Sequence, residues 1–335
     1  MPGRIRVGIS GWTYAPWRGV FYPEKWPAKR ELEYASRTLD GSLEINGTFY
    51  RMQLLPSYRS WYEQTPDDFQ FSLKGGRYIT HILRLDNAEL PLANFFASGM
   101  LYLREKLGPI LWQLPPNMSF DEERVRAFLE LLPKDTQAAA LLGAKHEPRV
   151  AEPYLEVDQN RPVRHAMEVR HASFATEKFV RLLREHNVAL CIAETAGKWP
   201  LAEDVTADFM YIRLHGAEQI YVSGYTDEQL DEWARRIKAW AEGGEPEGAR
   251  RIDGPQPKRK EGRDVYCYFD NTDVKQRAPF DALALMERLG LKPRFDLPPP
   301  PRLATARTEL GEKGSEQAVK KVSKKRIAAS KRSPE

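Results

Sequence analysis

Three observations predict an α/β protein that folds as a single (β/α)8 TIM barrel. Eight short apolar runs of strand length follow one another along the chain. Helix-like segments separate most of these runs, and this alternation is typical of βαβ units with a parallel sheet. The chain has 335 residues, whereas roughly 200–300 residues complete one barrel, so eight such units favour a closed barrel over an open sheet.

The eight expected strands are rich in branched and aromatic side chains, which favour extended structure. They are Arg6–Ser10, Ser42–Asn46, Phe69–Lys74, Ile110–Leu114, Ala166–His171, Val188–Glu194, Phe209–Gly216 and Val265–Asn271. Helices are expected where apolar residues recur every three or four positions. The clearest are Asp121–Leu132, with Asp121 as its N-cap, Ser173–Glu185, Asp227–Trp240 and Pro279–Leu289.

Residues 1–297 are expected to form the barrel, and two segments differ from it in composition. Residues 243–263 form a basic loop rich in Gly and Pro, and its position before the eighth strand predicts that it lies opposite the functional face. Residues 298–335 begin with a stiff proline linker and continue into a polar segment that we expect to be disordered.

The positive charge of the chain lies in this tail. Residues 313–335 hold eight basic and two acidic residues, and because the whole chain carries only +4, the remainder is net negative. Such a tail fits salt-sensitive, sequence-independent contact with DNA or RNA, and a solubilising tail is the alternative. The candidate contacts are Lys320, Lys321, Lys324, Lys325, Arg326, Lys331 and Arg332.

The ends and the apolar content of the chain predict its compartment. No long apolar run follows the first residues, so we expect no signal peptide, and no stretch reaches the ~18–20 apolar residues that cross a bilayer. Cys191 and Cys267 each lie within an apolar strand and are expected to be buried free thiols. These features predict a soluble cytoplasmic protein.

The strands carry polar residues at alternate positions, on the face that a barrel turns inward. Apolar residues occupy the outward positions of the second, third, fifth and seventh strands. The inward set therefore includes Ser42, Glu44, Asn46, Gln70, Ser72, Lys74, Glu168, Arg170, Tyr211, Arg213 and His215, and Gln113, Asp270 or Asn271 extend it. Buried unpaired charges are costly, so these groups must pair with one another, bind a ligand or contact water.

We interpret this set as a polar pocket at the carboxyl ends of the strands. The candidate catalytic residues are Glu168 and His215, as a general acid and base, with Glu44 and Lys74. The candidate substrate-binding residues are Asn46, Tyr50, Gln113, Arg170, His171, Arg213, Asp270, Asn271, Trp12 and Tyr14. The alternatives are structural: Glu44 pairs with Lys74, Arg213 neutralises Glu44 and Glu168, and His215 is a satisfied interior imidazole.

Two further groups have less direct interpretations. The first βα loop is dense in aromatic residues that either stack on a ligand or pack as a hydrophobic lid. We assign His81, His146, His165 and His186 to loops or the surface. No cofactor or metal is predicted, because Lys74, Arg170 and Arg213 would repel a dication; a divalent cation held by Glu44, Glu168, Glu194, His171, His215 and Asp270 is the alternative.

Seven motifs in this order resemble the YecE-like family, domain of unknown function 72, over about residues 4–292. They are SGWTYAPWRGVFYP (10–23), LEINGTFYRMQ (43–53), FQFSLKGGRYITH (69–81), LWQLPPN (111–117), MEVRHASF (167–174), YIRLHG (211–216) and YFDNTD (268–273). The resemblance implies a (β/α)8 barrel similar in outline to sugar-isomerase and apurinic-endonuclease barrels, and it implies no settled reaction.

The chain departs from this family at two positions. Asp270 stands where the family usually has Asn, which adds a carboxylate to the pocket, and Phe174 replaces a Trp. The leading hypothesis is an enzyme with acid–base chemistry of the hydrolase, lyase or isomerase type, acting on an anionic, phosphorylated or sugar-containing substrate, including nucleic acid. The competing hypotheses are a nucleic-acid-binding module that uses the tail, and a small-ligand sensor.

Overall fold

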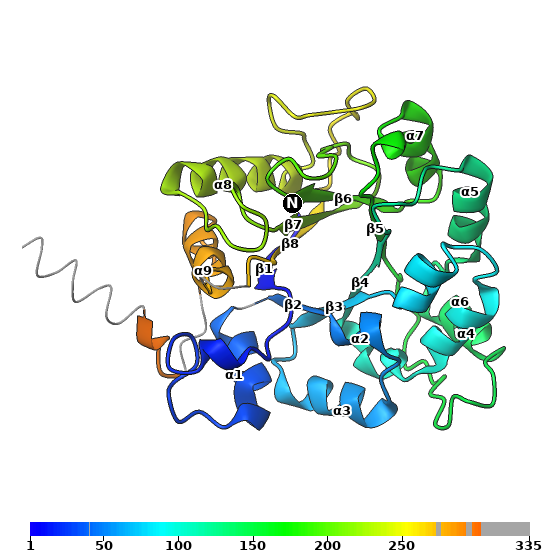
Figure 1. Cartoon of the computed structure of the whole chain (residues 1–335), viewed down its shortest axis with the longest axis horizontal. Helices are drawn as coiled ribbons and strands as arrows, with labels where there is room; N and C mark the ends of the chain where they lie inside the picture. Colours follow the sequence, from blue (N-terminus) through cyan, green and yellow to red (C-terminus); the bar gives the residue numbers. More distant parts are fainter. Residues whose placement is uncertain (40, 273–275, 293–296, 303–335) are drawn as a thin grey trace, which may run out of the picture.

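Eight parallel strands stand side by side in the order β1-β8-β7-β6-β5-β4-β3-β2 in the computed structural model, which describes residues 1–39, 41–272, 276–292 and 297–302 (Figure 1). The strands are β1 (Ile5–Ile9), β2 (Ser42–Ile45), β3 (Gln70–Lys74), β4 (Leu107–Gln113), β5 (His165–Glu168), β6 (Ala189–Glu194), β7 (Phe209–Leu214) and β8 (Asp264–Phe269). Each overlaps a strand predicted from the sequence, and the predicted TIM barrel is confirmed.

The ring of strands closes where β1 meets β2. Ser10 and Glu44 form a parallel bridge there, and the Gly11 amide donates a 2.8 Å hydrogen bond to the Glu44 carbonyl. A Cβ atom on Gly8 would lie 1.9 Å from the carbonyl oxygen of Ser42. The two strands therefore approach this closely only because residue 8 has no side chain.

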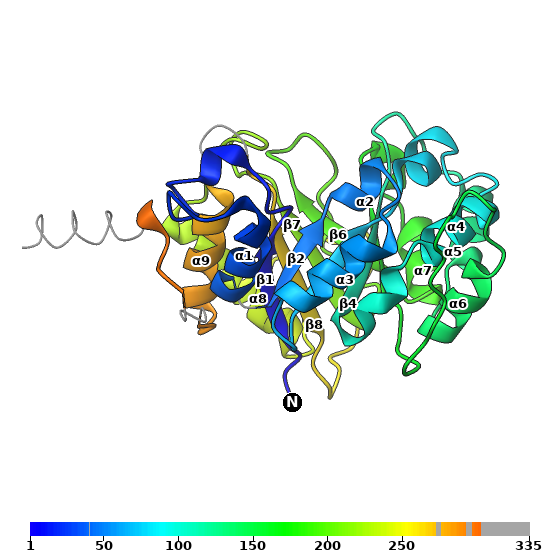
Figure 2. The ribbon, with the colours of Figure 1, turned by 90° about the horizontal axis from the view of Figure 1, so that it is seen from below.

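Helices surround the strands on their outer side (Figures 1 and 2). They are α1 (Glu31–Thr38), α2 (Gly47–Tyr50), α3 (Leu55–Gln64), α4 (Glu89–Ala97), α5 (Glu122–Leu131), α6 (Thr136–Gly143), α7 (Glu177–Glu185), α8 (Asp227–Ala241) and α9 (Ala278–Arg288). None of the described helices is long and apolar enough to cross a membrane.

The helix boundaries follow their capping residues. Asp121 caps α5 as predicted, since its carboxylate accepts from the Arg124 amide. The predicted helix at Ser173 begins later, at Glu177, because the Thr176 hydroxyl caps it there and a separate 3₁₀ turn occupies residues 172–174. A capping box between Thr226 and Gln229 starts α8.

The connection between β6 and β7 contains no helix over residues 195–208, all of which the structure describes. The loop at residues 243–263 packs against this segment: the Glu203 amide donates to the Arg250 carbonyl at 2.8 Å, and Asp204 accepts from the Ile252 and Asp253 amides. Asp253 also accepts from Arg184 of α7 at 2.5 Å. The loop therefore covers the outside of the barrel between α7 and α8. Its later part lies at the amino face, where Lys258, Arg259 and Lys260 line a cavity with the first two residues and the Gly262 amide donates to Met1.

The aromatic residues of the first βα loop divide into two groups. Trp17, Phe21 and Tyr22 are fully buried, and Phe21 packs on Tyr34 of α1 and Phe280 of α9. Most of the aromatic residues of this loop therefore pack in the hydrophobic core. Trp12 and Tyr14 remain partly exposed at the carboxyl ends of the strands.

The start of the proline linker is attached to the barrel. The Tyr34 hydroxyl donates to the Pro298 carbonyl at 2.8 Å, and the Arg302 amide donates to the Val20 carbonyl at 3.2 Å. The basic residues predicted to contact nucleic acid, Lys320 to Arg332, lie outside the described residues.

Candidate functional site

Tyrosines and small residues fill the middle of the barrel. The hydroxyls of Ser42 and Tyr268 lie 2.6 Å apart, as do those of Ser72 and Tyr211. Small residues such as Ala166 on neighbouring strands leave room for these rings. The lumen therefore holds hydrogen-bonded hydroxyls where many barrels hold branched apolar side chains.

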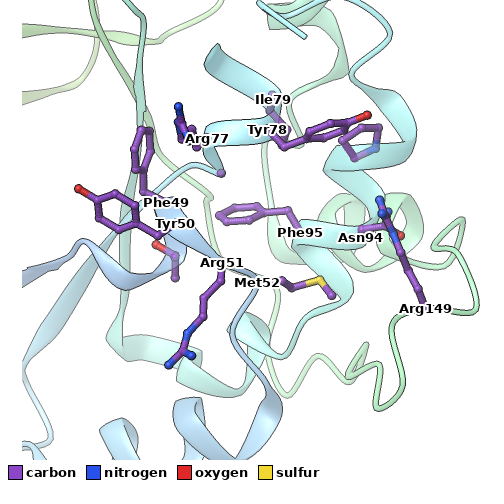
Figure 3. Close-up of a pocket in the computed structure, with 13 residues that line it drawn as sticks. Phe49, Tyr50, Arg51, Met52, Arg77, Tyr78, Ile79, Asn94, Phe95 and Arg149 are labelled. Carbon is purple, nitrogen blue, oxygen red and sulfur yellow. The ribbon is translucent and has the colours of Figure 1, made fainter. Parts of the chain in front are cut away.

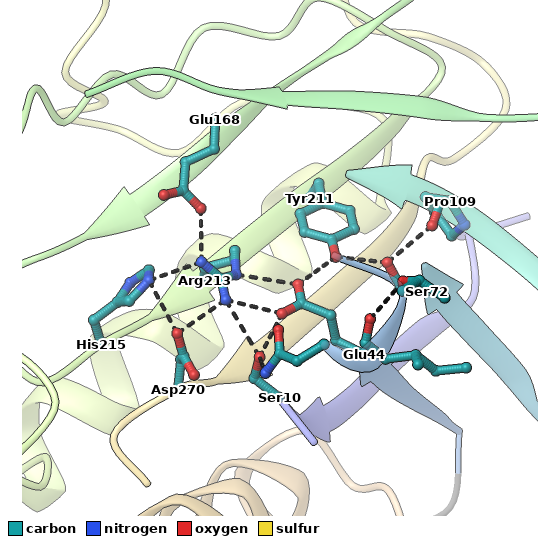
Figure 4. Close-up of polar contacts among 12 residues, drawn as sticks. Ser10, Glu44, Ser72, Pro109, Glu168, Tyr211, Arg213, His215 and Asp270 are labelled. Atoms are coloured by element: carbon teal, nitrogen blue, oxygen red, sulfur yellow. Dashed lines mark hydrogen bonds and ion pairs between the residues drawn. The ribbon is translucent and has the colours of Figure 1, made fainter. Parts of the chain in front are cut away.

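Above this layer, Arg213 of β7 connects carboxylates from three other strands (Figure 4). Its Nη2 donates to Glu44 Oε1 at 2.8 Å and to Asp270 Oδ2 at 2.9 Å, and its Nη1 donates to Glu168 Oε2 at 2.7 Å. We call Ser10, Glu44, Glu168, Arg213, His215 and Asp270 the Arg213 network. Glu44, Glu168, Arg213 and His215 are completely buried.

The charges of this network fix the ionisation of its carboxylates. Burial alone would raise the pKa of Glu44, but Arg213 and Lys74, with hydrogen bonds from Ser10 and Tyr211, outweigh burial and lower it. Burial likewise opposes ionisation of Glu168, whose pKa is nevertheless lowered by Arg170 and Arg213. Both groups are therefore carboxylates at neutral pH, which leaves each a weak proton acceptor.

His215 remains neutral in this network. Burial, followed by the charge of Arg213, lowers the pKa of its imidazole to about 4. Its Nε2 lies 2.9 Å from Arg213 Nη1 and 3.4 Å from Asp270 Oδ2. Because an arginine only donates, the shorter contact makes Nε2 the acceptor and assigns the proton to Nδ1. Nδ1 is buried and has no hydrogen-bond partner among the described residues, so its N–H is an unused donor.

Lys74 ends β3 on the side of the opening and has few polar contacts. Its side chain is 8% exposed, and Nζ lies 4.6 Å from the centre of the Phe49 ring, with no hydrogen-bond acceptor among the described residues. Burial and the charge of Arg213 lower the pKa of its amine to about 8, against the opposing effect of Glu44 and the other carboxylates. An amine with this pKa can exchange a proton near neutral pH.

The groups near the opening are mainly cationic. Arg170 donates to Glu168 at 2.8 Å and lies 3.8 Å from the centre of the Trp199 ring. His81, beside Phe49, has its pKa lowered to about 4 by burial and then by the charges of Arg170, Lys74 and Arg77. Burial is the larger cause of this shift, and the three cations add to it.

The other predicted site residues lie in different places. Trp12, Tyr14 and Asn46 line a cavity of about 280 Å³ between β1 and β2, where Asn46 donates to Ser10 and its Oδ1 is buried without a described partner. Gln113 is buried at the end of β4. His171 accepts from the Ser173 amide through Nδ1 and stays partly exposed.

Three predicted placements differ from the structure. Asn271 turns out of the lumen and donates to Asp281 of α9 at 2.8 Å, because β8 ends at Phe269 and the next inward position is Asp270. Tyr50 lies 76% exposed beside a separate cavity. The assignment of His165 to a loop or the surface is wrong: it is buried at the start of β5, between the Trp112 indole and the Pro133 carbonyl.

Sequence reasoning did not select Ser10, His81 and Trp199 for the site. Ser10 follows β1 at an inward position and donates to Glu44, which strand alternation could have indicated. His81 lies in a short π-helical turn, Tyr78–Ile82, and Trp199 in the connection between β6 and β7, so strand alternation applies to neither, and only the structure places them at the opening.

The carboxylates and imidazoles do not form a metal-binding set. Among the described residues, no three such side chains, with or without a thiol, are arranged to hold a metal ion. Arg213 stands between Glu44, Glu168 and Asp270, and Glu194 accepts from the Trp233 indole of α8 on another side of the barrel. The prediction that no cofactor is bound remains a prediction.

Comparison with known proteins gives one family. A family model described as "Protein of unknown function DUF72" matches residues 6–305. The UPF0759 protein YunF of Bacillus subtilis is 29% identical over 126 residues, which span 36% of this chain and 43% of that relative.

Two solved structures show the same fold. A DUF72 family protein from Thermotoga maritima superposes with a TM-score of 0.63 at 22% identity, over 86% of this chain and 99% of that one. A DUF72 family protein from Enterococcus faecalis superposes with a TM-score of 0.62 at 15% identity, over 86% of this chain and 96% of that one. At these low sequence identities, the two structures show only that the barrel fold is shared.

Proposed function

Because the chain belongs to the DUF72 family of proteins of unknown function, we propose from its side-chain geometry that it is an enzyme acting on an anionic, phosphorylated or sugar-containing substrate. The substrate would bind at the carboxyl ends of β2, β3, β5, β7 and β8, the face at which barrel enzymes hold their substrates.

The observation that carries this proposal is that cationic groups near the opening keep hydrogen-bond donors without an acceptor among the described residues. The carboxylates of the Arg213 network already accept from Arg213 or Arg170, and of these Glu44 and Glu168 lie deeper than Lys74, whereas Asp270 is partly exposed. Lys74 is nearer the opening and has no hydrogen-bonded counterpart among the described residues. A phosphate or carboxylate of a ligand would supply the missing acceptors for Lys74 and the free edge of Arg170.

The pKa values indicate different roles for the four candidate catalytic residues. Glu168 and Glu44 are held ionised by cations, so they support charge balance and orientation. Lys74, with a pKa of about 8, is the group best matched to accept and return a proton near neutral pH. His215, neutral and with a free Nδ1–H, would donate a hydrogen bond to an oxygen on which charge develops.

This arrangement supports acid–base chemistry of the isomerase, lyase or hydrolase type. Arg170 and the ammonium of Lys74 would hold the anionic group, and Lys74, which is protonated below its pKa of about 8, would give its proton to the substrate as a general acid. The hydroxyl groups of a sugar would find an acceptor in Asn46 Oδ1.

A ligand screen with matched variants tests the proposal. Thermal shift and isothermal calorimetry would compare ribose 5-phosphate with ribose, and mass spectrometry would monitor conversion of a panel of phosphorylated sugars. We expect stabilisation by phosphorylated sugars, lost in Lys74→Met and retained in Lys178→Met, whose lysine is 76% exposed on α7. Equal binding of neutral sugars, or full turnover by Lys74→Met, would contradict the proposal.

The charge of the tail favours a second candidate function, non-specific nucleic-acid binding. Eight basic residues within 313–335 would contact phosphates. The full chain should then bind duplex DNA or RNA with a steep salt dependence, and a chain that ends at Arg302 should not. Equal nucleic-acid binding by the full chain and by the shortened chain would show that the tail is not the binding segment.

A further inference from the structure

A second cavity, of about 290 Å³, opens beside the barrel mouth between the loops that follow β2 and β3 (Figure 3). Phe49 of α2 and Phe95 of α4 form its apolar walls, and Tyr50 and Tyr78 stand at its edge with 76% and 52% of their surfaces exposed. We call it the aromatic cavity. Two exposed aromatic rings beside a cavity are available to stack on a planar ligand. Covering their apolar surface with such a ligand would be favourable.

The rim of the aromatic cavity is positively charged. Arg51, Arg77 and Arg149 line it, and none of its thirteen lining residues is acidic. Arg149 pairs with Glu147 at 2.8 Å, whereas Arg51 and Arg77 have no carboxylate partner among the described residues. Aromatic walls with unpaired arginines at the rim complement a flat ring that carries a negative group.

One residue connects this cavity to the candidate active site. Phe49 lines the aromatic cavity, and the same ring lies 4.6 Å from Lys74 Nζ and packs edge-on against His81. After burial, the charges of Arg170, Lys74 and Arg77 lower the pKa of His81, so cations that line the two sites lie near the same imidazole. A single ligand can therefore place an anionic group at Lys74 and a ring beyond Phe49.

We propose that the aromatic cavity is the base-binding subsite for a nucleotide whose phosphate lies between the cavity and Lys74. This inference rests on the proposed function, because it names the class of anionic substrate that the site takes. The base would stack on Tyr50, Tyr78 and Phe95, and Arg51 or Arg77 would bind phosphate oxygens. A neutral aromatic ligand would occupy only the base-binding subsite, and a sugar phosphate without a base would occupy only the phosphate-binding part of the site.

Gly76 provides a variant that fills the cavity without disturbing the fold. It lines the cavity, a Cβ built on it meets no atom within 4 Å, and its backbone is not left-handed, so a leucine there would enter the open space. Gly254, on the loop at residues 243–263, is equally open, and Gly254→Leu is the matched control. Tyr78→Ser is the second variant, should Gly76→Leu not fold.

Calorimetry with AMP, ribose 5-phosphate and a single-stranded oligoadenylate tests the subsite. We expect AMP to bind about tenfold or more tightly than ribose 5-phosphate, which lacks the base. Gly76→Leu should reduce the affinity for AMP to that for ribose 5-phosphate and leave the latter unchanged, and Gly254→Leu should change neither. Preference for the oligoadenylate over AMP, lost in Gly76→Leu, would identify a nucleic-acid strand as the source of the nucleotide.

The outcomes separate this inference from the proposed function. Equal affinities for AMP and ribose 5-phosphate, both lost in Lys74→Met, would overturn the base subsite and leave the anionic site intact. Nucleotide binding that survives Gly76→Leu and Tyr78→Ser would also overturn it. Absence of nucleotide binding, with self-association that Tyr78→Ser removes, would show instead that the exposed rings form a protein interface.

Discussion

Replacing Arg213 with methionine removes the one cation that connects three carboxylates inside the barrel. Glu168 would keep its contact with Arg170, and Asp270 is 14% exposed and can bind water. Glu44 is completely buried and would keep the hydroxyls of Ser10 and Tyr211 and the charge of Lys74, which forms no hydrogen bond with it among the described residues. We therefore expect the loss of unfolding free energy in Arg213→Met to come mainly from the buried charge of Glu44.

The expected loss is large for one substitution. Breaking a buried ion pair by removing one partner costs about 3–5 kcal/mol, because the other charge stays buried without compensation. An exposed pair is worth about 0–1 kcal/mol. Arg288→Met is the matched control, since Arg288 also bonds two carboxylates, Asp227 and Asp231, and those are 85% and 67% exposed.

The pH dependence identifies the cause of the loss. In the native protein the pKa of Glu44 is lowered, so its contribution to stability is present above its unfolded pKa, about 4.5, and is lost as pH falls below that value. Without Arg213, burial should raise the pKa of Glu44, and protonation would then relieve the buried charge. The difference in unfolding free energy between native and variant proteins should therefore shrink between pH 7 and pH 5.

Urea unfolding, followed by circular dichroism at both pH values, measures this difference. A loss of less than about 1 kcal/mol at pH 7 would show that water or a rearrangement compensates Glu44. An equal loss at both pH values would show that the cost is steric and that the electrostatic reasoning is wrong.

Three further predictions follow from single contacts. Competitive amine labelling should give Lys74 a titration midpoint near pH 8, and a midpoint near 10.5 would show that its burial is incomplete. Gly75→Ala should destabilise the protein by about 1–3 kcal/mol in thermal unfolding, because its Cβ would lie 2.3 Å from the Trp112 ring, whereas Gly76→Ala should be nearly neutral. Gly8→Ala should separate β1 from β2 and lower the melting temperature, since its Cβ would lie 1.9 Å from a β2 carbonyl oxygen; an unchanged melting temperature would contradict this account of barrel closure.

Strand alternation made part of the site predictable. On β7, Tyr211 and Arg213 point into the lumen because the period of a strand is two, and His215 continues that face. The same rule places Glu44 and Glu168 in the lumen. The sequence therefore indicates which groups face inward, even though it contains no distances between them.

The partners of those groups could not be predicted in the same way. Arg213 bonds residues 169, 45 and 57 positions away in the chain, and their contact depends on strand order, barrel tilt and side-chain rotamers. The rule also ends where a strand ends, which is why Asn271 turns toward α9. Residues such as His81, in the π-helical turn after β3, and Trp199, in the connection after β6, lie outside the strands to which the rule applies. The covering of β6 and β7 by a loop requires contacts between distant segments.

A polar lumen does not by itself require a ligand, because the inner charges balance. Glu44, Glu168 and Asp270 face Lys74, Arg170 and Arg213, and burial keeps the imidazole above them neutral. Buried polar atoms without a hydrogen-bond partner point to a ligand instead.

Three of these atoms lie at the carboxyl end of the barrel, and Arg6 Nε and Nη1, near the amino end of β1, are also buried without a hydrogen-bond partner among the described residues. Asn46 Oδ1 after β2 and His215 Nδ1 after β7 are buried without a described partner, and Lys74 Nζ at the end of β3 has only an aromatic ring beside it. A network that served stability alone would gain from satisfying each of them, since an unmade buried hydrogen bond costs about 1–3 kcal/mol. An acceptor, a donor and an amine left free on three different strands, all at the carboxyl face, are what a bound oxygen-rich anion would satisfy together.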